Sequence, residues 1–413
     1  MRNFIKESVK KQIYTEAYNF TRVIIKNYEE GVLKENYGNI LLYLVEIMNI
    51  DFFPEIRQTI EEIIIFIISG IREQIYDENF SDLRYSGMIS GIGNVAFSIR
   101  NLAIETKGLK KFSEYLDQLL GLIIQKYVKS LKEISVIPAH YDVLYGVAGV
   151  LYYLLDYTPR FDIVEEIINY LVWLTQEGIY KRDKVINFHI KREQQYLESE
   201  RREMPDGQIN FGLAHGMVGP LIALAKAKYK GYTGNGVDDA IEIIFRMYEN
   251  FSFYEENIIK FPTQLPYKAY VDKKVINPTF NAGWCYGNLG IVRGLMKSAK
   301  YLEYNDKYVL YEKELLKIIN QPLEKYNLHV PVLCHGFSSV VAVQYAIYKE
   351  NRNEAFLLTA ERNILKTINE HNKFCDKGYI EKCALLEGAG GVVLSLISAI
   401  YPDMKFPKLL MID

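Results

Sequence analysis

The sequence predicts an all-α fold, specifically a seven-fold α/α toroid made of a double ring of helix hairpins. Three observations support this prediction. Apolar residues recur with the helical period along most of the chain, glycine-led turns precede the most apolar runs, and these turns return at a nearly regular spacing. The alternation that marks half-buried strands is scarce.

Helical periodicity appears from the N-terminal part of the chain to its C-terminal part. Each such stretch is expected to form a helix with one face in the core. The clearest stretches are 40–45, 56–71, 116–124, 163–174, 221–225 and 394–400.

Seven small-residue turns each begin with a glycine and lead into an apolar run. Glycine at such a position tolerates a positive φ and lets another backbone come close. Successive first glycines are 53, 55, 70, 71, 49 and 52 residues apart, and about 50 residues accommodates two ordinary helices with their connections. We expect seven helix pairs that close into a ring, with the helices after the glycines as the inner layer; an open helical array is the alternative. The glycines are Gly38, Gly91, Gly146, Gly216, Gly287, Gly336 and Gly388.

The two longest intervals bracket His215 and carry additional residues. The first contains the mixed-charge stretch 181–206, and the second contains 254–280, where prolines interrupt helical patterning and 267–275 has β character. We expect a single toroid domain over 1–413, with these two segments inserted as an accessory lobe beside the site. Solvated surface loops are the alternative.

Composition narrows the class of protein. The chain is 49% hydrophobic with a net charge of −2, so it has no basic excess for binding nucleic acid. Four cysteines suit a reducing compartment better than a disulfide scaffold. The N-terminus is charged where a signal peptide needs apolar residues, and the run 63–71 is much shorter than the ~20 residues that span a bilayer. We expect a soluble, cytoplasmic protein.

Reactive side chains stand on three of the glycine turns. His215 precedes Gly216, Cys285 stands two residues before Gly287, and Cys334 and His335 precede Gly336. Thiolates and imidazole are ligands that zinc selects, and three protein ligands leave the open position of a catalytic zinc site. Equivalent positions on adjacent turns would face the same mouth of the ring. Buried structural cysteines are the alternative.

Three further residues are candidates for proton transfer or hydrogen bonding. His215 is the best general acid or base, although a core histidine is the alternative. Asp142, four residues before Gly146, either caps the following helix or orients His215. Tyr286 either donates a hydrogen bond into the site or packs. We expect the remaining candidates to be structural or solvated: Cys375 and Cys383 structural, His189 solvated, His329 in a loop and His371 in a polar connection.

The motifs Leu-Ala-His-Gly-x-x-Gly, Trp-Cys-Tyr-Gly and Cys-His-Gly together resemble the LanC family of lanthionine synthetases, especially its stand-alone cyclases of the nisin type. The resemblance covers essentially the whole chain. It implies a seven-fold α/α toroid, one zinc ion, and an accessory lobe likened to an SH2 domain. It implies Cys285, Cys334 and His335 as zinc ligands, and it matches His215, Asp142 and Tyr286 to the family's other active-site positions.

The resemblance also implies a reaction and its partners. A cysteine thiol of a dehydrated precursor peptide adds to dehydroalanine or dehydrobutyrine, which forms the (methyl)lanthionine thioether rings of a lantibiotic. The implied partners are that precursor, a dehydratase and an exporter, and the implied membrane association is peripheral, through their complex.

One position departs from the family pattern. Cyclases of this type usually have an arginine four residues before the zinc cysteine, whereas this chain has Asn281. The departure leaves room for a related zinc enzyme that adds thiols such as glutathione to dehydro-residues. A non-catalytic scaffold of a peptide-modification complex is a second alternative, which the intact ligand set disfavours.

Overall fold

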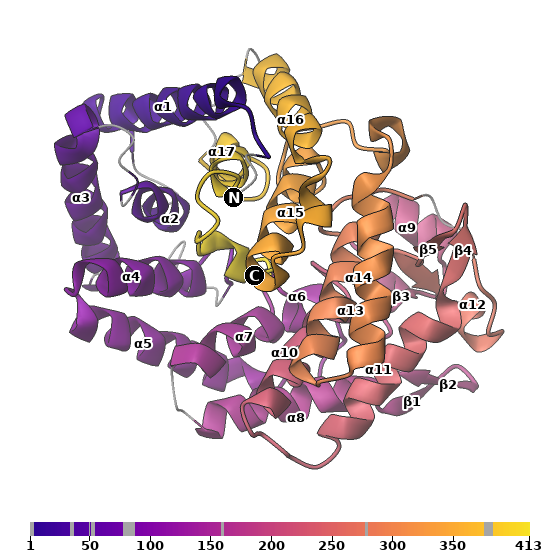
Figure 1. Ribbon diagram of the computed structural model, residues 1–413. Helices are drawn as coiled ribbons and strands as arrows, with labels where there is room; N and C mark the ends of the chain where they lie inside the picture. Colours follow the sequence, from indigo (N-terminus) through magenta and orange to yellow (C-terminus); the bar gives the residue numbers. More distant parts are fainter. Residues whose placement is uncertain are drawn as a thin grey trace. The chain divides into compact units, whose positions relative to one another are not determined.

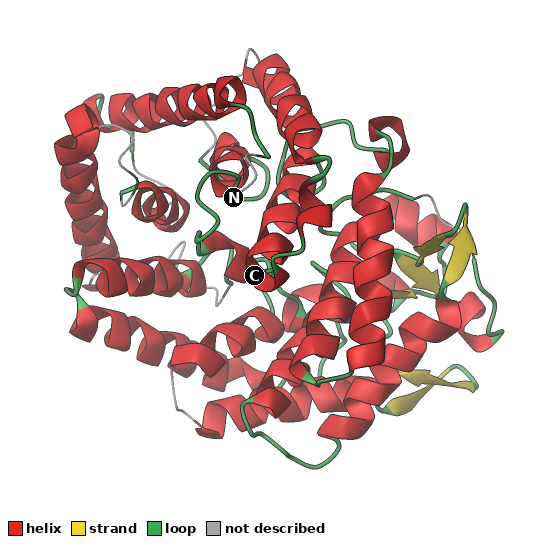
Figure 2. Ribbon diagram, in the orientation of Figure 1, coloured by secondary structure: helices red, strands yellow, loops and turns green. Residues whose placement is uncertain are grey.

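The computed structural model describes residues 4–33, 37–48, 50, 54–76, 87–157, 161–276, 280–375 and 383–413. Helices dominate these residues, and the strands are few and short (Figure 2). The chain divides into two compact units, one of Met1–Leu120 with Leu328–Leu409 and Asp413, the other of Gly121–Asn327 with Leu410–Ile412. Within the described ranges, no helix combines the length and apolarity needed to cross a membrane.

Paired helices build the first unit. Helix α2 packs against α3 and α4, α17 packs against α1, α2 and α15, and α15 packs against α16. The helices are α1 (Glu7–Glu29), α2 (Tyr37–Ile47), α3 (Arg57–Tyr76), α4 (Ile92–Thr106), α15 (Phe337–Asn351), α16 (Ala360–Cys375) and α17 (Ala389–Ser398), with 3-10 turns η1 (Pro54–Ile56), η4 (Glu354–Leu357) and η5 (Phe406–Lys408). Helix α5 (Lys110–Val128) contains the boundary at Leu120.

Three helix hairpins build the second unit. They pair α7 with α8, α10 with α11 and α13 with α14, and α10 packs against both α7 and α13 (Figure 1). The elements are α6 (Pro138–Tyr141), α7 (Val147–Tyr157), α8 (Phe161–Thr175), α10 (Val218–Tyr229), α11 (Val237–Phe251), α13 (Asn288–Tyr301), α14 (Asn305–Asn320) and the 3-10 turn η3 (Leu323–Tyr326).

A helix begins at each predicted glycine turn. Gly91 caps α4 with a φ of 109°, a conformation that favours glycine. A Cβ on Gly290, in the first turn of α13, would overlap the backbone oxygen of Trp284. Most residues of α2, α4, α7, α10, α13, α15 and α17 are buried, as expected for the inner helix of each pair.

The two inserted stretches contact each other within the second unit. Just after the first stretch, strand β3 pairs with β6 of the second in an antiparallel register that sets Ile209 opposite Leu265. The Tyr267 hydroxyl donates to the Asp183 carboxylate over 2.7 Å. The elements in and next to these stretches are β1 (Glu177–Tyr180), β2 (Asp183–Ile186), η2 (Arg192–Gln194), α9 (Glu198–Glu203), β3 (Gln208–Asn210), β4 (Phe253–Glu255), β5 (Ile258–Lys260), β6 (Gln264–Pro266) and α12 (Tyr267–Val271).

The β character expected for 267–275 is wrong. Residues Tyr267–Val271 form the short helix α12, and the strand lies just before it, at Gln264–Pro266. Pro266 stands at the N-cap of this helix with a φ of −56°, where its missing N–H removes no helical hydrogen bond.

Candidate active site

Backbone hydrogen bonds connect successive glycine turns of the second unit. The Val143 N–H donates to the carbonyl of Ala214 over 3.1 Å, and the Ala214 N–H donates to the carbonyl of Cys285 over 3.1 Å. The turns before α7, α10 and α13 therefore form a hydrogen-bonded series. This series holds Asp142, His215 and Cys285 near one another, although more than 140 residues of sequence separate the first from the last.

Asp142 caps its turn and also binds His215. One carboxylate oxygen accepts the backbone N–H groups of Leu144, Tyr145 and Gly146 at 3.0, 2.7 and 2.8 Å. The other lies 2.6 Å from Nδ1 of His215. The side chain is fully buried. Both roles considered for Asp142 in the sequence thus occur together in the structure, because the two oxygens face different partners.

The pairing with Asp142 distinguishes the two ring nitrogens of His215. Since Asp142 accepts from Nδ1–H, Nε2 is the atom that can give or take a proton. The side chain is 20% exposed. Burial by itself would lower the pKa of His215, but the hydrogen bond and charge of Asp142, together with Cys285, reverse this effect and raise the pKa above its ordinary value.

Two tyrosine rings flank His215. The ring of Tyr145 stacks on the imidazole with centroids 6.5 Å apart, and the ring of Tyr286 lies at 5.7 Å. Gly212 permits the second approach, since a Cβ there would contact the Tyr286 ring and the Cys285 carbonyl oxygen. Burial raises the pKa of Tyr286 well above its ordinary value, so its hydroxyl keeps its proton at neutral pH.

Asn281 shapes the loop that carries Cys285. Its side-chain oxygen accepts the Gly283 N–H over 2.9 Å, and its carbonyl accepts the Asn288 N–H over 3.0 Å. The first bond is an Asx turn, a local structure that an arginine side chain cannot make. Asn281 therefore has a structural role at the position where the family pattern has an arginine.

The second candidate cysteine stands on a turn of the same design. The Cys334 N–H donates to the Leu386 carbonyl over 3.0 Å, and Gly336 caps α15. Cys285 is buried, Cys334 is intermediate and His335 is exposed, and their possible ligand atoms all lie within 4.8 Å of one another. Two thiols and an imidazole in one group form a donor set that suits zinc.

The expectations for two other histidines are wrong. His189 is buried and its Nε2 lies 2.9 Å from the Asp206 carbonyl oxygen, because the two inserted stretches fold over it. His371 is fully buried on α16 instead of standing in a polar connection, and burial lowers its pKa to about 4. Cys375 lies 3.7 Å from its Nε2. His329 is exposed outside the helices, as expected.

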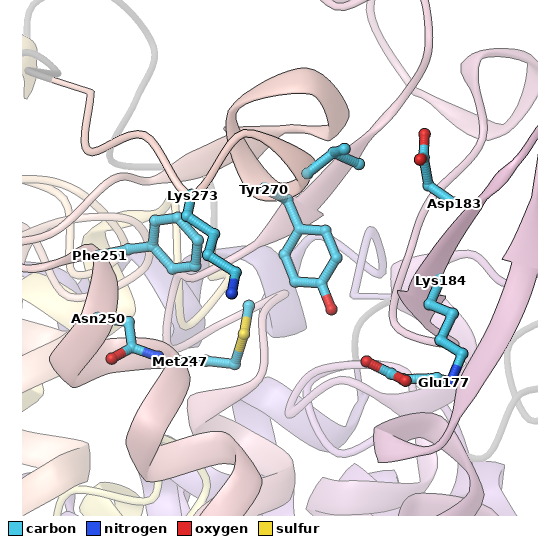
Figure 3. A pocket seen from close by; sticks show the side chains of 9 residues that line it. Glu177, Asp183, Lys184, Met247, Asn250, Phe251, Tyr270 and Lys273 are labelled. Atoms are coloured by element: carbon cyan, nitrogen blue, oxygen red, sulfur yellow. The ribbon is translucent and has the colours of Figure 1, made fainter.

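A separate pocket of about 690 Å³ lies among α11, α12 and the β1–β2 hairpin. Its lining combines apolar side chains with charges of both signs, and Figure 3 shows the Tyr270 ring extending into it. None of the candidate catalytic residues lines this pocket. The lining residues are Glu177, Asp183, Lys184, Met247, Asn250, Phe251, Tyr270, Val271 and Lys273.

Comparison with known proteins gives consistent matches over almost the whole chain. The model of a family described as lanthionine synthetase C-like protein matches residues 37–411. Nisin biosynthesis protein NisC of Lactococcus lactis subsp. lactis is 27% identical over 402 residues, which is 95% of this chain and 91% of that protein. A solved structure of nisin cyclase matches with a TM-score of 0.82 at 23% identity, covering 98% of each chain. The structural match confirms the α/α toroid predicted from the sequence.

Proposed function

The chain belongs to the lanthionine synthetase C-like family, and we propose that it is a zinc-dependent lanthipeptide cyclase. The proposed reaction joins a cysteine thiol of a dehydrated precursor peptide to a dehydroalanine or dehydrobutyrine of the same peptide. The observation that carries the proposal is the coexistence of a Cys–Cys–His donor group with a histidine paired to a buried carboxylate.

Cys285, Cys334 and His335 are the proposed metal ligands. Three ligands of this kind leave a fourth position for a substrate, as in catalytic zinc sites. When bound there, zinc lowers the pKa of a peptide thiol, which is near ~8.5 in a free cysteine, so that the nucleophilic thiolate is available at neutral pH.

His215 and Asp142 handle the proton in the proposed mechanism. The sulfur forms a bond to the β-carbon of the dehydro-residue, the carbon–carbon π bond breaks, and its electrons move to the carbonyl oxygen as an enolate. His215 then delivers a proton from Nε2 to the α-carbon, which balances the proton lost by the thiol. The buried Asp142 carboxylate stabilises the protonated imidazole and fixes its orientation through Nδ1.

We assign the inserted stretches 181–206 and 254–280 to an accessory lobe beside the site. Asn288, the first residue of α13, donates to the Ile259 carbonyl over 2.6 Å, which ties β5 to the helix that follows Cys285. A dehydratase and an exporter are the proposed partners, and the cytoplasm is the proposed location.

Incubation with a dehydrated precursor peptide tests the proposal. Ring closure consumes peptide thiols without changing the peptide mass, so we expect fewer alkylation adducts by mass spectrometry and an unchanged parent mass. Added glutathione distinguishes the first alternative, since an enzyme that adds external thiols would give a glutathione adduct. Persistent free thiols with wild-type protein that contains zinc would contradict the cyclase and favour the scaffold.

A further inference from the structure

We infer that Asn210 is a positioning residue, which orients the Tyr286 hydroxyl to donate a hydrogen bond to the substrate carbonyl oxygen. This inference rests on the proposed function. In the proposed reaction, negative charge develops on this carbonyl oxygen as the enolate forms. The protein must stabilise that charge. Hydrogen-bond donors that are fixed in advance stabilise such charge most effectively.

The orientation of the Asn210 amide follows from a bond to the main chain. Its Oδ1 accepts the Gly212 N–H over 3.0 Å. A backbone N–H can only donate, so the atom facing it must be oxygen and the opposite atom must be the NH₂ nitrogen. That nitrogen lies 3.3 Å from the Tyr286 hydroxyl oxygen. Asn210 is 1% exposed, so solvent does not compete for the amide.

This polarity determines what the tyrosine hydroxyl can do. Since the amide occupies the oxygen of Tyr286 as a donor, the phenolic hydrogen points to a different acceptor. Within the described residues, Asn210 is the hydrogen-bond partner that the structure gives this hydroxyl. The Tyr286 ring lies beside His215, the proton donor to the α-carbon. The carbonyl oxygen that receives the enolate charge is two bonds from that carbon, within reach of the same group.

Asn281 does not supply this donor. Its side chain is committed to the Asx turn with Gly283, and an amide has no positive charge to offer an enolate. Tyr286, held by Asn210, supplies a neutral donor beside His215. Asn210 itself acts through Tyr286 and needs no contact with the substrate.

A double-mutant cycle tests the inference. Asn210→Asp replaces the NH₂ group that donates to the Tyr286 hydroxyl with an oxygen that can only accept. At about pH 8, well above the ordinary carboxyl pKa of about 3.9, the new oxygen accepts the Tyr286 hydrogen and withdraws it from the substrate. Loss of one such donor costs about 10²–10³ in kcat, so we expect Asn210→Asp and Tyr286→Phe each to lower kcat by about that factor, with little change in KM. The double variant should be no slower than Tyr286→Phe.

Controls distinguish the positioning role of Asn210 from a purely structural role. Asn187 donates through its amide to the Trp173 carbonyl over 2.9 Å in the first inserted stretch, so Asn187→Asp makes the same change at a different place and should keep the wild-type kcat. Zinc content should be unchanged in every variant. Equal losses from Asn210→Asp with and without the Tyr286 hydroxyl would overturn the inference. A wild-type protein that forms no thioether would instead refute the proposed function.

Discussion

At the scale of single residues, the pairing of Asp142 with His215 is central to the proposed chemistry. The carboxylate has four close partners, three backbone N–H groups and the imidazole. A carboxylate held in this way keeps the histidine in one orientation and, in the proposed mechanism, stabilises its protonated form. In the proposed mechanism the His215 proton leaves from Nε2, the ring atom not bound to the carboxylate.

Replacement of His215 tests its role as proton donor. His215→Asn should slow ring closure by about 10²–10⁴-fold, the usual cost of losing general acid catalysis. Some activity should survive, because the other residues still bind and position the peptide. Thiol loss measured over time gives the rate, and His329→Asn, at an exposed loop histidine, is the matched control. Cyclisation by His215→Asn at the wild-type rate would exclude this residue as the donor.

Residue types and their spacing pointed to part of the candidate site. Cys285 and Cys334 were candidates because each stands two residues before a turn glycine, and His335 because it lies between Cys334 and Gly336. Asn210 was not, since 76 residues separate it from Tyr286 and asparagine has no distinctive spacing. The sequence flagged Asn281 only as a departure, and its Asx turn became evident from the loop conformation. His189 and His371 were misjudged because polar neighbours in sequence do not reveal the elements that cover a side chain.

At the scale of elements, tight glycine turns are the recurring device of the fold. The close packing of Gly290 against the Trp284 carbonyl predicts a strong effect of a single methyl group. Gly290→Ala should destabilise the protein by about 1–3 kcal/mol, as expected for overpacking that shifts backbone. Gly108→Ala is the control, since its nearest neighbour would be the Thr106 hydroxyl at 3.4 Å. Urea unfolding compares them, and equal midpoints would show that the loop accommodates the methyl group.

A half-buried carboxyl on α2 predicts a pH dependence of stability. Glu46 accepts the backbone N–H groups of Lys405 and Phe406 at 2.7 and 2.5 Å. Burial raises its pKa from 4.5 to about 7, against the opposing effect of these bonds and of nearby lysines. The folded state therefore binds more protons than the unfolded state between these values. Its contribution to stability is present below pH 4.5 and is lost as pH rises to about 7.

Removal of this charge should make the protein more stable in mild base. Glu46→Gln keeps an oxygen acceptor and cannot ionise. One pKa unit corresponds to about 1.4 kcal/mol, and the side chain is only partly buried, so we expect a gain of about 1–3 kcal/mol at pH 8 and little at pH 4.5. Urea midpoints at the two pH values provide the measurement, with the exposed Glu61→Gln as control. A gain of the same size at both values would show that ionisation is not the cause.

Helix periodicity predicted the elements better than it predicted their partners. The inner helices begin at the glycine turns because the apolar runs and the caps agree there. The short strands of the inserted stretches gave weaker signals, and 267–271 became helical behind Pro266. Three or four residues are too few for a periodic pattern, so tertiary pairing such as β3 with β6 decides their conformation.

At the scale of the whole molecule, the chain uses one architectural unit to build a site from distant segments. Each glycine turn is local in sequence, yet the turns before α7, α10 and α13 are joined by backbone hydrogen bonds. Asp142, His215 and Cys285 stand on those turns and therefore lie close together, although no single segment of the chain contains all three. The fold class could be predicted because the unit repeats, whereas the individual strands and short helices of the accessory stretches could not be, because they occur once.

The metal content of purified variants tests most directly whether metal binding and proton transfer belong to different residues, as proposed. Wild-type protein should contain about one zinc per chain. Cys285→Ala, Cys334→Ala and His335→Ala should lose it, whereas His215→Asn and the control Cys375→Ala should retain it, as measured by elemental mass spectrometry. Stoichiometric zinc in Cys334→Ala, or zinc-free His215→Asn, would contradict the assignment of ligands and proton donor.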